Sequence, residues 1–156
     1  MKKIGVIGLG NPLRRDDGIG ILLLERVRTQ KKYEKKIECI DGGTGGMAVL
    51  HVLARFDTVL IIDAVDFHGR HGEVRLFSFE DIQTLNTTGR LSTHDVDFLQ
   101  VLRLSQDLHE LPSNLMIFGI QPHDVSPGSG LSNVLQSALD DIYKKLSEEL
   151  ETFLSP

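Results

Sequence analysis

The chain has 156 residues, of which 40% are hydrophobic and 25% are charged. This length and composition are typical of one globular domain and exclude a disordered, fibrous or disulfide-stabilised protein. The formal net charge of −5 argues against a general attraction to nucleic acid or anionic lipid, because both depend on basic surfaces. We therefore expect residues 1–156 to form a single domain, with no nucleic acid and no membrane among its partners.

The single cysteine, Cys39, excludes an internal disulfide and a cysteine-based zinc site. No histidine lies near it in the sequence, so we interpret it as a buried, unreactive thiol. The amino-terminal stretch MKKIGVIG lacks the long apolar run of a signal peptide, and no segment reaches the roughly 18 apolar residues of a membrane span. The sequence therefore predicts a cytoplasmic protein.

Short β-type runs alternate with helical patterns in the amino-terminal part of the chain. Candidate strands cover residues 3–8, 37–41 and 58–64, and helical patterns lie between them at residues 18–30 and 47–55. The third run, TVLIIDA, is apolar and β-branched, as expected for a central strand of a parallel sheet. This β-α-β-α-β order predicts a doubly wound α/β domain with right-handed crossovers.

The remaining part of the chain predicts one antiparallel strand in an otherwise parallel sheet. The segment AVDFHGRHG, which leads to a strand-like run at residues 73–79, is shorter than a parallel crossover requires. Three further elements follow: a helix at residues 93–104 capped by Thr93, a strand at residues 115–121, and a helix at residues 132–154 capped by Ser132. Asp95 and Asp97 are interpreted as first-turn acids that the helix dipole favours. The prediction is thus a mixed, mostly parallel sheet of about five strands.

The stretch GLGNPLRRDDGIG, residues 8–20, joins the first predicted strand to the first predicted helix. Its glycines suit a phosphate-binding turn, but the third glycine of a dinucleotide fingerprint and the GK[ST] of a P-loop are absent. Asp16 and Asp17 stand at the helix start, where two carboxylates would repel a pyrophosphate. The turn therefore indicates a site for a cation.

A second carboxylate, Asp63, lies near the end of the third predicted strand. If the strand order begins 2-1-3, the loops after strands one and three meet where open α/β sheets bind ligands. Taken singly, Asp17 is better explained as a helix cap and Asp63 as a turn residue, but this topology brings them together. With one histidine they would suit a divalent transition ion. Among six histidines, His94 at a helix start and His123 after the last strand are the best placed.

Five motifs resemble, in the same order, those of the hydrogenase maturation endopeptidases, which act on nickel-iron hydrogenases. They are GLGNPLRRDDGIG at 8–20, DGGTGG at 41–46, IIDAVD at 61–66, STHDVDFLQVL at 92–102 and FGIQPHDVSPGSGLS at 118–132. The resemblance implies a three-layer α/β/α sandwich. It also implies an enzyme that removes a short carboxy-terminal extension from the hydrogenase large-subunit precursor after nickel insertion.

The resemblance further implies the identity of the site residues. The family's two metal-contacting acidic residues fall on Asp17 and Asp63, and its histidine falls on His94. Where some relatives carry a glutamate, this chain has the shorter side chain of Asp17. The implied metal is the nickel already held by the precursor, and no organic cofactor is expected to be permanently bound. Alternatively, Asp16 or Asp17 would act as the general base for the attacking water.

Two other functions stay open on the sequence. One is a metal-dependent hydrolase that holds its own metal and cleaves generic peptides. The other is a nickel-delivery or precursor-holding chaperone that binds the precursor without shortening it. The fold alone does not decide among them. The HExxH and GxSxG motifs of other hydrolases are absent, and the motif order favours the peptidase.

Overall fold

The computed structural model describes all 156 residues, and five strands form one sheet in the order β2-β1-β3-β5-β4. The strands are β1 (Ile4–Gly8), β2 (Glu38–Asp41), β3 (Thr58–Ala64), β4 (Val74–Phe77) and β5 (Asn114–Ile120). β4 pairs antiparallel with β5, and all other neighbouring strands are parallel. The predicted mixed sheet, its single antiparallel strand and the 2-1-3 order are confirmed.

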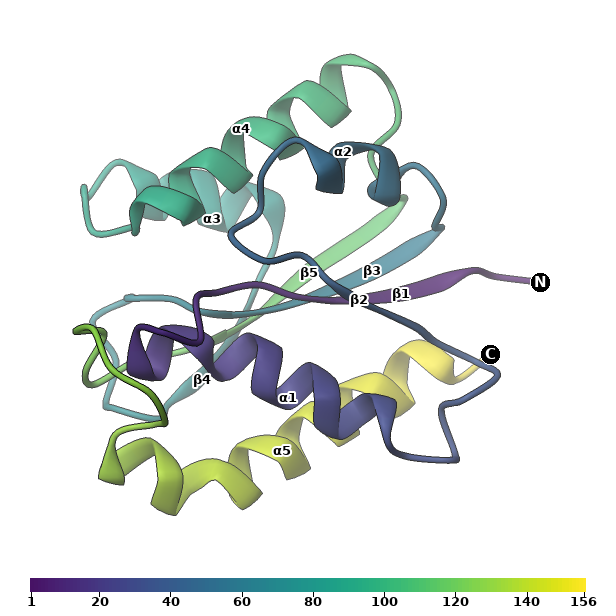
Figure 1. Cartoon of the computed structure of the whole chain (residues 1–156). Coiled ribbons are helices and arrows are strands. Elements are labelled where there is room, and N and C mark those ends of the chain that lie inside the picture. The colour runs from purple at the N-terminus through teal and green to yellow at the C-terminus, as the bar shows by residue number, and fades with distance from the viewer.

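Helices cover both faces of this sheet (Figure 1). One face carries α1 (Ile19–Arg28) and α5 (Asn133–Leu154), and the other carries α2 (Ala48–Leu53), α3 (Phe79–Asn86) and α4 (Thr93–Asp107). The α/β/α sandwich is therefore confirmed. None of these helices is both long enough and apolar enough to cross a lipid bilayer.

The position of β3 in the middle of the sheet explains why its sequence is apolar without alternation. All seven of its residues are buried. Val59 and Ile61 pack into the core beneath α2, α3 and α4, whereas Leu60 and Ile62 pack into the core beneath α1 and α5. Because successive side chains of a strand point to opposite faces, a strand covered on both sides is apolar throughout.

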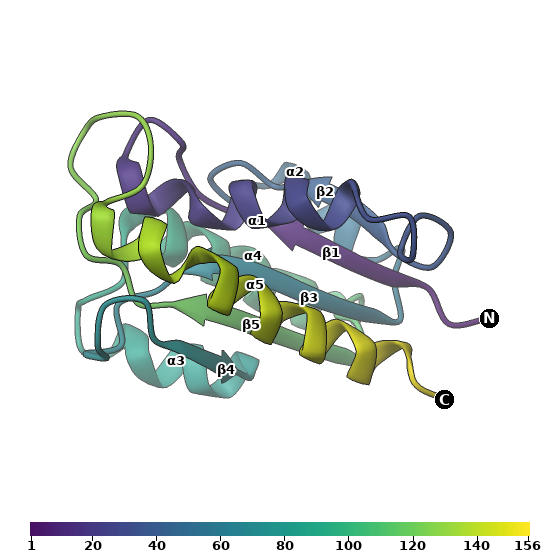
Figure 2. The ribbon, with the colours of Figure 1, turned by 90° about the horizontal axis from the view of Figure 1, so that it is seen from below.

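The topology places the first loop and the loop after β5 at one end of the sheet. The crossovers through α1 and α2 lie on opposite faces, so the carboxyl ends of β1 and β3 border a crevice. Figure 2 shows the loop before α1 and the loop before α5 side by side at this end. Both chain termini lie at the other end of the molecule in both views.

Three local expectations need correction. Ser92, not Thr93, caps α4, because the Ser92 side chain accepts a hydrogen bond from the backbone N–H of Asp95. Helix α3 was not expected, although Ser78 and Asp81 form a capping box at its start. Cys39 is half-buried rather than buried, since β2 is an edge strand, and this partial burial raises the pKa of the thiol. The Ser132 cap of α5 is confirmed.

Candidate active site

The loop after β1 turns sharply so that Asp17 lies at the end of the sheet. Gly10 has a φ of 132°, and a Cβ at this position would lie 1.9 Å from the carbonyl oxygen of Asp17, so only glycine fits. Asp17 itself lies in a short 3-10 helix, η1 (Arg15–Gly18), that leads into α1. The backbone N–H of Asn11 donates to Oδ2 of Asp17 over 2.9 Å and leaves Oδ1 for other partners.

A second glycine brings the start of α1 against the sheet. A Cβ on Gly20 would lie 2.3 Å from the carbonyl oxygens of Leu9 and Ile62. The helix can therefore approach the ends of β1 and β3 only because this position carries no side chain. The glycines of the first loop thus serve a close helix–sheet contact, which places Asp17 near Asp63.

The three predicted ligands lie together, because the carboxylates of Asp17 and Asp63 both approach Nε2 of His94. This nitrogen lies 3.6 Å from Oδ1 of Asp17 and 3.6 Å from Oδ1 of Asp63. A third carboxylate, from Asp95, approaches it to 3.3 Å. The most compact set is Asp63, His94 and Asp95, whose ligand atoms all lie within 4.8 Å of one another. Asp17 joins this group through its contact with His94.

Burial and mutual contact strongly perturb this cluster. Burial raises the pKa of Asp63 well above its usual value, and the adjacent Asp95 adds to the rise. Burial alone would also raise the pKa of Asp95, but its contacts with Asp63 and His94 outweigh burial and lower this pKa. Burial alone would lower the pKa of His94, whereas Asp63 and Asp95 raise it to about 11. The surrounding carboxylates thus favour the charged form of the His94 imidazole in the free protein.

The donor atoms of this cluster fit a divalent transition ion. Oδ1 of Asp63 and Nε2 of His94 are buried and have no hydrogen-bond partner, which is rare for buried polar atoms in native proteins. Two ligands that are each about 2.1 Å from one ion are themselves roughly 3 to 3.5 Å apart, close to the separations around His94. Carboxylate oxygens with imidazole nitrogen suit a borderline ion such as nickel or zinc.

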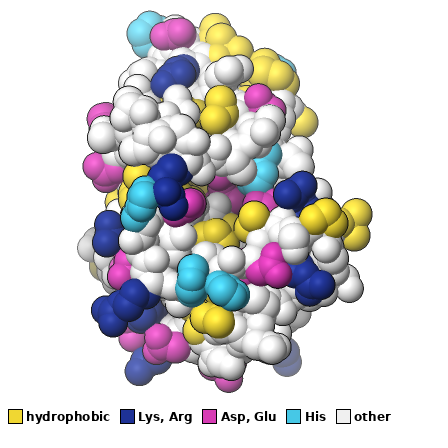
Figure 3. Space-filling model, turned by 90° about the vertical axis from the view of Figure 1, so that its left-hand side faces the viewer, with side chains coloured by type: hydrophobic (Ala, Val, Ile, Leu, Met, Phe, Trp, Pro, Cys, Tyr) yellow, Lys and Arg dark blue, Asp and Glu magenta, His cyan; other side chains and the backbone are white.

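A cavity of about 780 Å³ opens beside the cluster. Asp17, His94 and Asp95 line it, whereas Asp63 lies behind them and is 3% exposed. Figure 3 looks onto this end of the molecule and shows acidic side chains in a hollow with histidine and basic side chains around it. The other polar side chains that line the cavity include Arg14, Thr44, Asp66, His71, Arg90, Asp97, Gln121 and His123.

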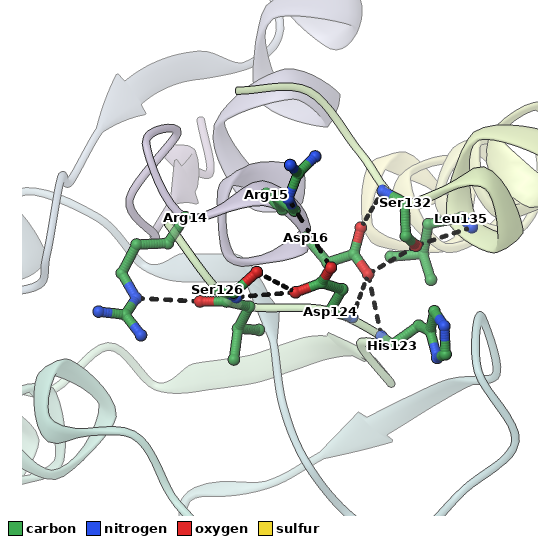
Figure 4. Close-up of polar contacts among 9 residues, drawn as sticks. Arg14, Arg15, Asp16, His123, Asp124, Ser126, Ser132 and Leu135 are labelled. Carbon is green, nitrogen blue, oxygen red and sulfur yellow. Dashed lines mark hydrogen bonds and ion pairs between the residues drawn. The ribbon is translucent and has the colours of Figure 1, made fainter. Parts of the chain in front are cut away.

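Asp16 is not brought to the cluster. Its side chain is fully buried and is not part of the cavity wall. Oδ2 accepts hydrogen bonds from the backbone N–H groups of His123 and Asp124 and from Oγ of Ser132, and Oδ1 accepts one from the backbone N–H of Ser132 (Figure 4). A role for Asp16 as general base stays a prediction. In the structure its carboxylate oxygens are bonded to residues 123–132 and not to the metal cluster.

Asp95 is the site residue that the sequence did not identify. It was interpreted as a first-turn acid of a helix, which it is. Adjacent residues on a helix normally point apart, so nothing in the sequence indicated a contact between His94 and Asp95. The only available hint was the acidic residue directly after the histidine in STHDVD.

Comparisons with known proteins agree on one family. The family model described as hydrogenase maturation protease matches residues 21–149, a stretch that begins after Asp17. The hydrogenase 2 maturation protease of Escherichia coli strain K12 is 29% identical over 139 residues, covering 88% of this chain and 84% of that protein. The hydrogenase expression/formation protein HoxM of Cupriavidus necator is 28% identical over 140 residues, covering 89% of this chain and 69% of HoxM.

Solved structures extend this likeness to the fold. The hydrogenase maturating endopeptidase HybD from E. coli superposes with a TM-score of 0.83 at 26% identity, over 96% of this chain and 93% of HybD. Some curated relatives are longer: the chain spans 58% of the HupD protein of Thiocapsa roseopersicina. The family match covers well over half of the chain and the structural match covers nearly all of it, which confirms the resemblance seen in the motifs. The chain belongs to the hydrogenase maturation protease family.

Proposed function

We propose that this chain is an endopeptidase that removes the carboxy-terminal extension of a nickel-iron hydrogenase large-subunit precursor after nickel insertion. The observation that carries the proposal is the convergence of Asp17, Asp63 and His94 beside a large open cavity. Membership of a protease family supports the hydrolytic step. Oδ1 of Asp63 and Nε2 of His94, two buried atoms without a hydrogen-bond partner, support recognition of a metal ion that arrives with the substrate.

The cavity supports a substrate larger than an ion. Its volume of about 780 Å³ lies in the range of pockets that enclose sizeable ligands. Its polar lining offers partners for peptide N–H and C=O groups. A precursor bound through its nickel would therefore present the adjoining peptide to the rest of the cavity wall.

Hydrolysis adds water to the scissile carbonyl carbon, breaks the carbon–nitrogen bond and transfers a proton to the leaving amine. Asp17 lines the cavity and keeps one carboxylate oxygen free of backbone hydrogen bonds, so it is placed to take a proton from the attacking water. Asp63 and Asp95 face the same nitrogen of His94, Nε2, so the three side chains are placed to contact one metal ion. The substrate's nickel would position the scissile bond and polarise its carbonyl.

The test is a cleavage assay on a nickel-loaded precursor, followed as a decrease in its mass. Asp17→Asn and His94→Ala are each expected to slow cleavage by about a hundredfold or more, because the first removes a carboxylate charge and the second an imidazole at the reacting end of the cavity. His51→Ala is the matched control, since His51 is an exposed histidine on α2 outside the cavity. A precursor without nickel is expected to keep its full mass with the unaltered enzyme.

Three outcomes would contradict this proposal. Unchanged cleavage by both site variants would remove the assigned site. A precursor that is bound but never shortened would indicate a holding or nickel-delivery chaperone. Cleavage of generic peptides by a chain that is purified with its own tightly bound metal would indicate a different metal-dependent hydrolase.

A further inference from the structure

The carboxylate of Asp16 joins two loops that are far apart in the sequence. It accepts four hydrogen bonds, all from residues 123–132, over distances of 2.7 to 2.9 Å (Figure 4). Three of its donors are backbone N–H groups, and the fourth is the hydroxyl of Ser132, the N-cap of α5. A fully buried carboxylate with this many donors is a strong fixed point for the segment that it holds.

Backbone hydrogen bonds hold the same two loops together. The N–H groups of Arg15 and Asp16 donate to the carbonyl oxygens of Gly128 and Asp124, over 3.1 and 3.0 Å. The N–H of Gly128 returns a bond of 2.9 Å to the carbonyl oxygen of Leu13. Residues 13–16 and the segment 123–128 are therefore one paired unit, and Asp16 is its buried centre.

An imidazole pair that the metal cluster does not use links this unit, through His123, to the loop before β4, through His71. The rings of His71 and His123 lie with their centroids 4.4 Å apart, and both side chains line the cavity. Nδ1 of His71 lies 3.0 Å from the carbonyl oxygen of Pro122. Because a carbonyl oxygen only accepts, Nδ1 is the donor, which leaves Nε2 of a neutral His71 as an acceptor.

We propose that Asp16 is a positioning residue of the peptidase: it fixes the backbone at His123, so that the His71–His123 pair binds the precursor's peptide in register with Asp17 and His94. The inference rests on the function proposed above. Nε2 of His71 would accept a hydrogen bond from a peptide N–H of the precursor. Asp16 itself touches neither the substrate nor the cluster, since its side chain is not part of the cavity wall.

The variant Asp16→Asn tests this role with little change of shape. An asparagine offers one acceptor oxygen, and its NH₂ group would face N–H donors, so part of the network must break. The KM for the nickel-loaded precursor is expected to rise about tenfold while kcat changes less than about threefold. The affinity of the enzyme for Ni²⁺, measured by calorimetry, is expected to stay within about twofold, because Asn11 still holds Asp17.

A double-mutant cycle with His123→Ala separates positioning from a general effect on folding. His123→Ala keeps the backbone N–H that Asp16 binds and removes only the imidazole. If Asp16 acts through the pair, the double variant should raise KM by about tenfold, like either single variant, and not by the hundredfold of independent effects. Asp81→Asn is the matched control, because Asp81 also accepts a backbone N–H at a helix start but lies on α3, outside the cavity.

The results that would overturn the inference are distinct. A hundredfold fall in kcat with an unchanged KM would make Asp16 a general base, and a tenfold loss of Ni²⁺ affinity would mean that it acts through Asp17. Additive effects in the cycle, or no effect on KM, would also contradict it. If Asp16→Asn does not fold, Ser132→Ala removes one of the four donors and is judged by the same cycle.

The proposed function and the positioning role can fail separately. If the unaltered enzyme binds the precursor without shortening it, the proposed function is wrong, and the cycle is then measured on the dissociation constant of the precursor. Imidazole NMR signals of His71 and His123 give a further readout without any cleavage. They are expected to shift in Asp16→Asn and to stay unchanged in Asp81→Asn, and unchanged signals in both variants would contradict the positioning role.

Discussion

His94 lies among three carboxylates that reach it by different routes. Asp17 comes from the 3-10 turn before α1, Asp63 from the end of β3, and Asp95 from the same helix as the histidine. Only Asp95 comes within 3.3 Å of Nε2. Because this carboxylate faces the same nitrogen that would bind a metal ion, Asp95 is placed as a further ligand beside His94.

Asp95→Asn is therefore expected to weaken binding of Ni²⁺ to the chain by about tenfold or more, because a neutral amide is a weaker metal ligand than a carboxylate. Calorimetric titration of the metal into the protein measures this loss. Asp107→Asn, at the far end of α4, is the control because its side chain is exposed and outside the cavity. Equal Ni²⁺ affinity in the two variants would show that Asp95 does not support the site.

The contrast between Asp17 and Asp16 shows which residue roles a sequence can predict. Asp17 follows β1 and Asp63 lies near the end of β3, so a strand order that begins 2-1-3 predicts their approach to one another. The partners of Asp16 lie 107 to 116 positions away along the chain, in a loop without regular structure. No periodicity encodes such contacts, and the role of Asp16 emerges only when the two loops are seen in space.

At the scale of single elements, the start of α4 depends on one serine. Ser92 and Thr93 both suit an N-cap, and the helix starts at Thr93 because the Ser92 hydroxyl accepts from the N–H of Asp95. Sequence preference alone could not choose between two neighbouring hydroxyl residues. The choice matters for function because it sets the position of His94 in the first turn.

Ser92→Ala is expected to lower the free energy of unfolding by about 1 kcal/mol, the usual loss for an N-cap, and Thr93→Ala by less than about 0.5 kcal/mol. Urea unfolding followed by circular dichroism measures both values. A larger loss of unfolding free energy for Thr93→Ala than for Ser92→Ala would show that Thr93 is the N-cap, as the sequence suggested.

A second polar junction ties the loop after β3 to its neighbours. Oδ1 of Asp66 accepts from Nε2 of Gln121 over 3.0 Å, and Oδ2 accepts from Arg90 over 2.8 Å. The side-chain oxygen of Gln121 accepts from the N–H groups of Phe67 and Gly69 in turn. These bonds connect β5 and the segment before α4 to the loop that carries His71.

The junction makes a pH-dependent contribution to stability. Burial alone would raise the pKa of Asp66, but Gln121, the N–H of His68 and Arg90 outweigh burial and lower it below 3.8. A carboxyl whose pKa is lower in the folded state adds stability above its unfolded pKa and loses it as pH falls through the folded value. Asp66→Asn should therefore cost about 1 kcal/mol at neutral pH, since the pair with Arg90 is partly exposed.

Urea unfolding at two pH values measures this dependence. The difference between the unaltered chain and Asp66→Asn is expected to shrink as the pH falls through the lowered pKa of Asp66 in the folded state. Asp107→Asn is the control, because Asp107 is exposed at the end of α4, away from this junction. A difference that stays constant with pH would show that Asp66 acts without its charge.

At the scale of the whole molecule, one sheet separates two cores that both depend on β3. Residues of β3 pack alternately into the core under α2, α3 and α4 and into the core under α1 and α5. If β3 leaves the sheet, apolar side chains of both cores become exposed to water. The doubly wound architecture was predictable because apolar runs, helical periods and one short connection all indicated it, whereas the eight-residue helix α3 gave too short a pattern.

Thermal unfolding is accordingly expected to show one transition. Tyr33 and Tyr143 pack in the core under α1 and α5, so tyrosine fluorescence reports on that face, whereas far-ultraviolet circular dichroism reports on all helices. Coincident midpoints from the two signals are the expected result for a single cooperative domain. Two separated midpoints would show that the faces unfold independently.

The close contact of Gly20 with the backbone of Leu9 and Ile62 affects the entropy that is lost when the enzyme binds a ligand. This contact fixes the start of α1 against the end of β3, so the backbone that carries Asp17 and Asp63 has little freedom to move. A ligand that meets groups already held in place forfeits less conformational entropy than one that must order them. The backbone of the free enzyme at this contact is therefore expected to match that of the substrate complex, which makes the unbound structure a suitable template for docking the precursor.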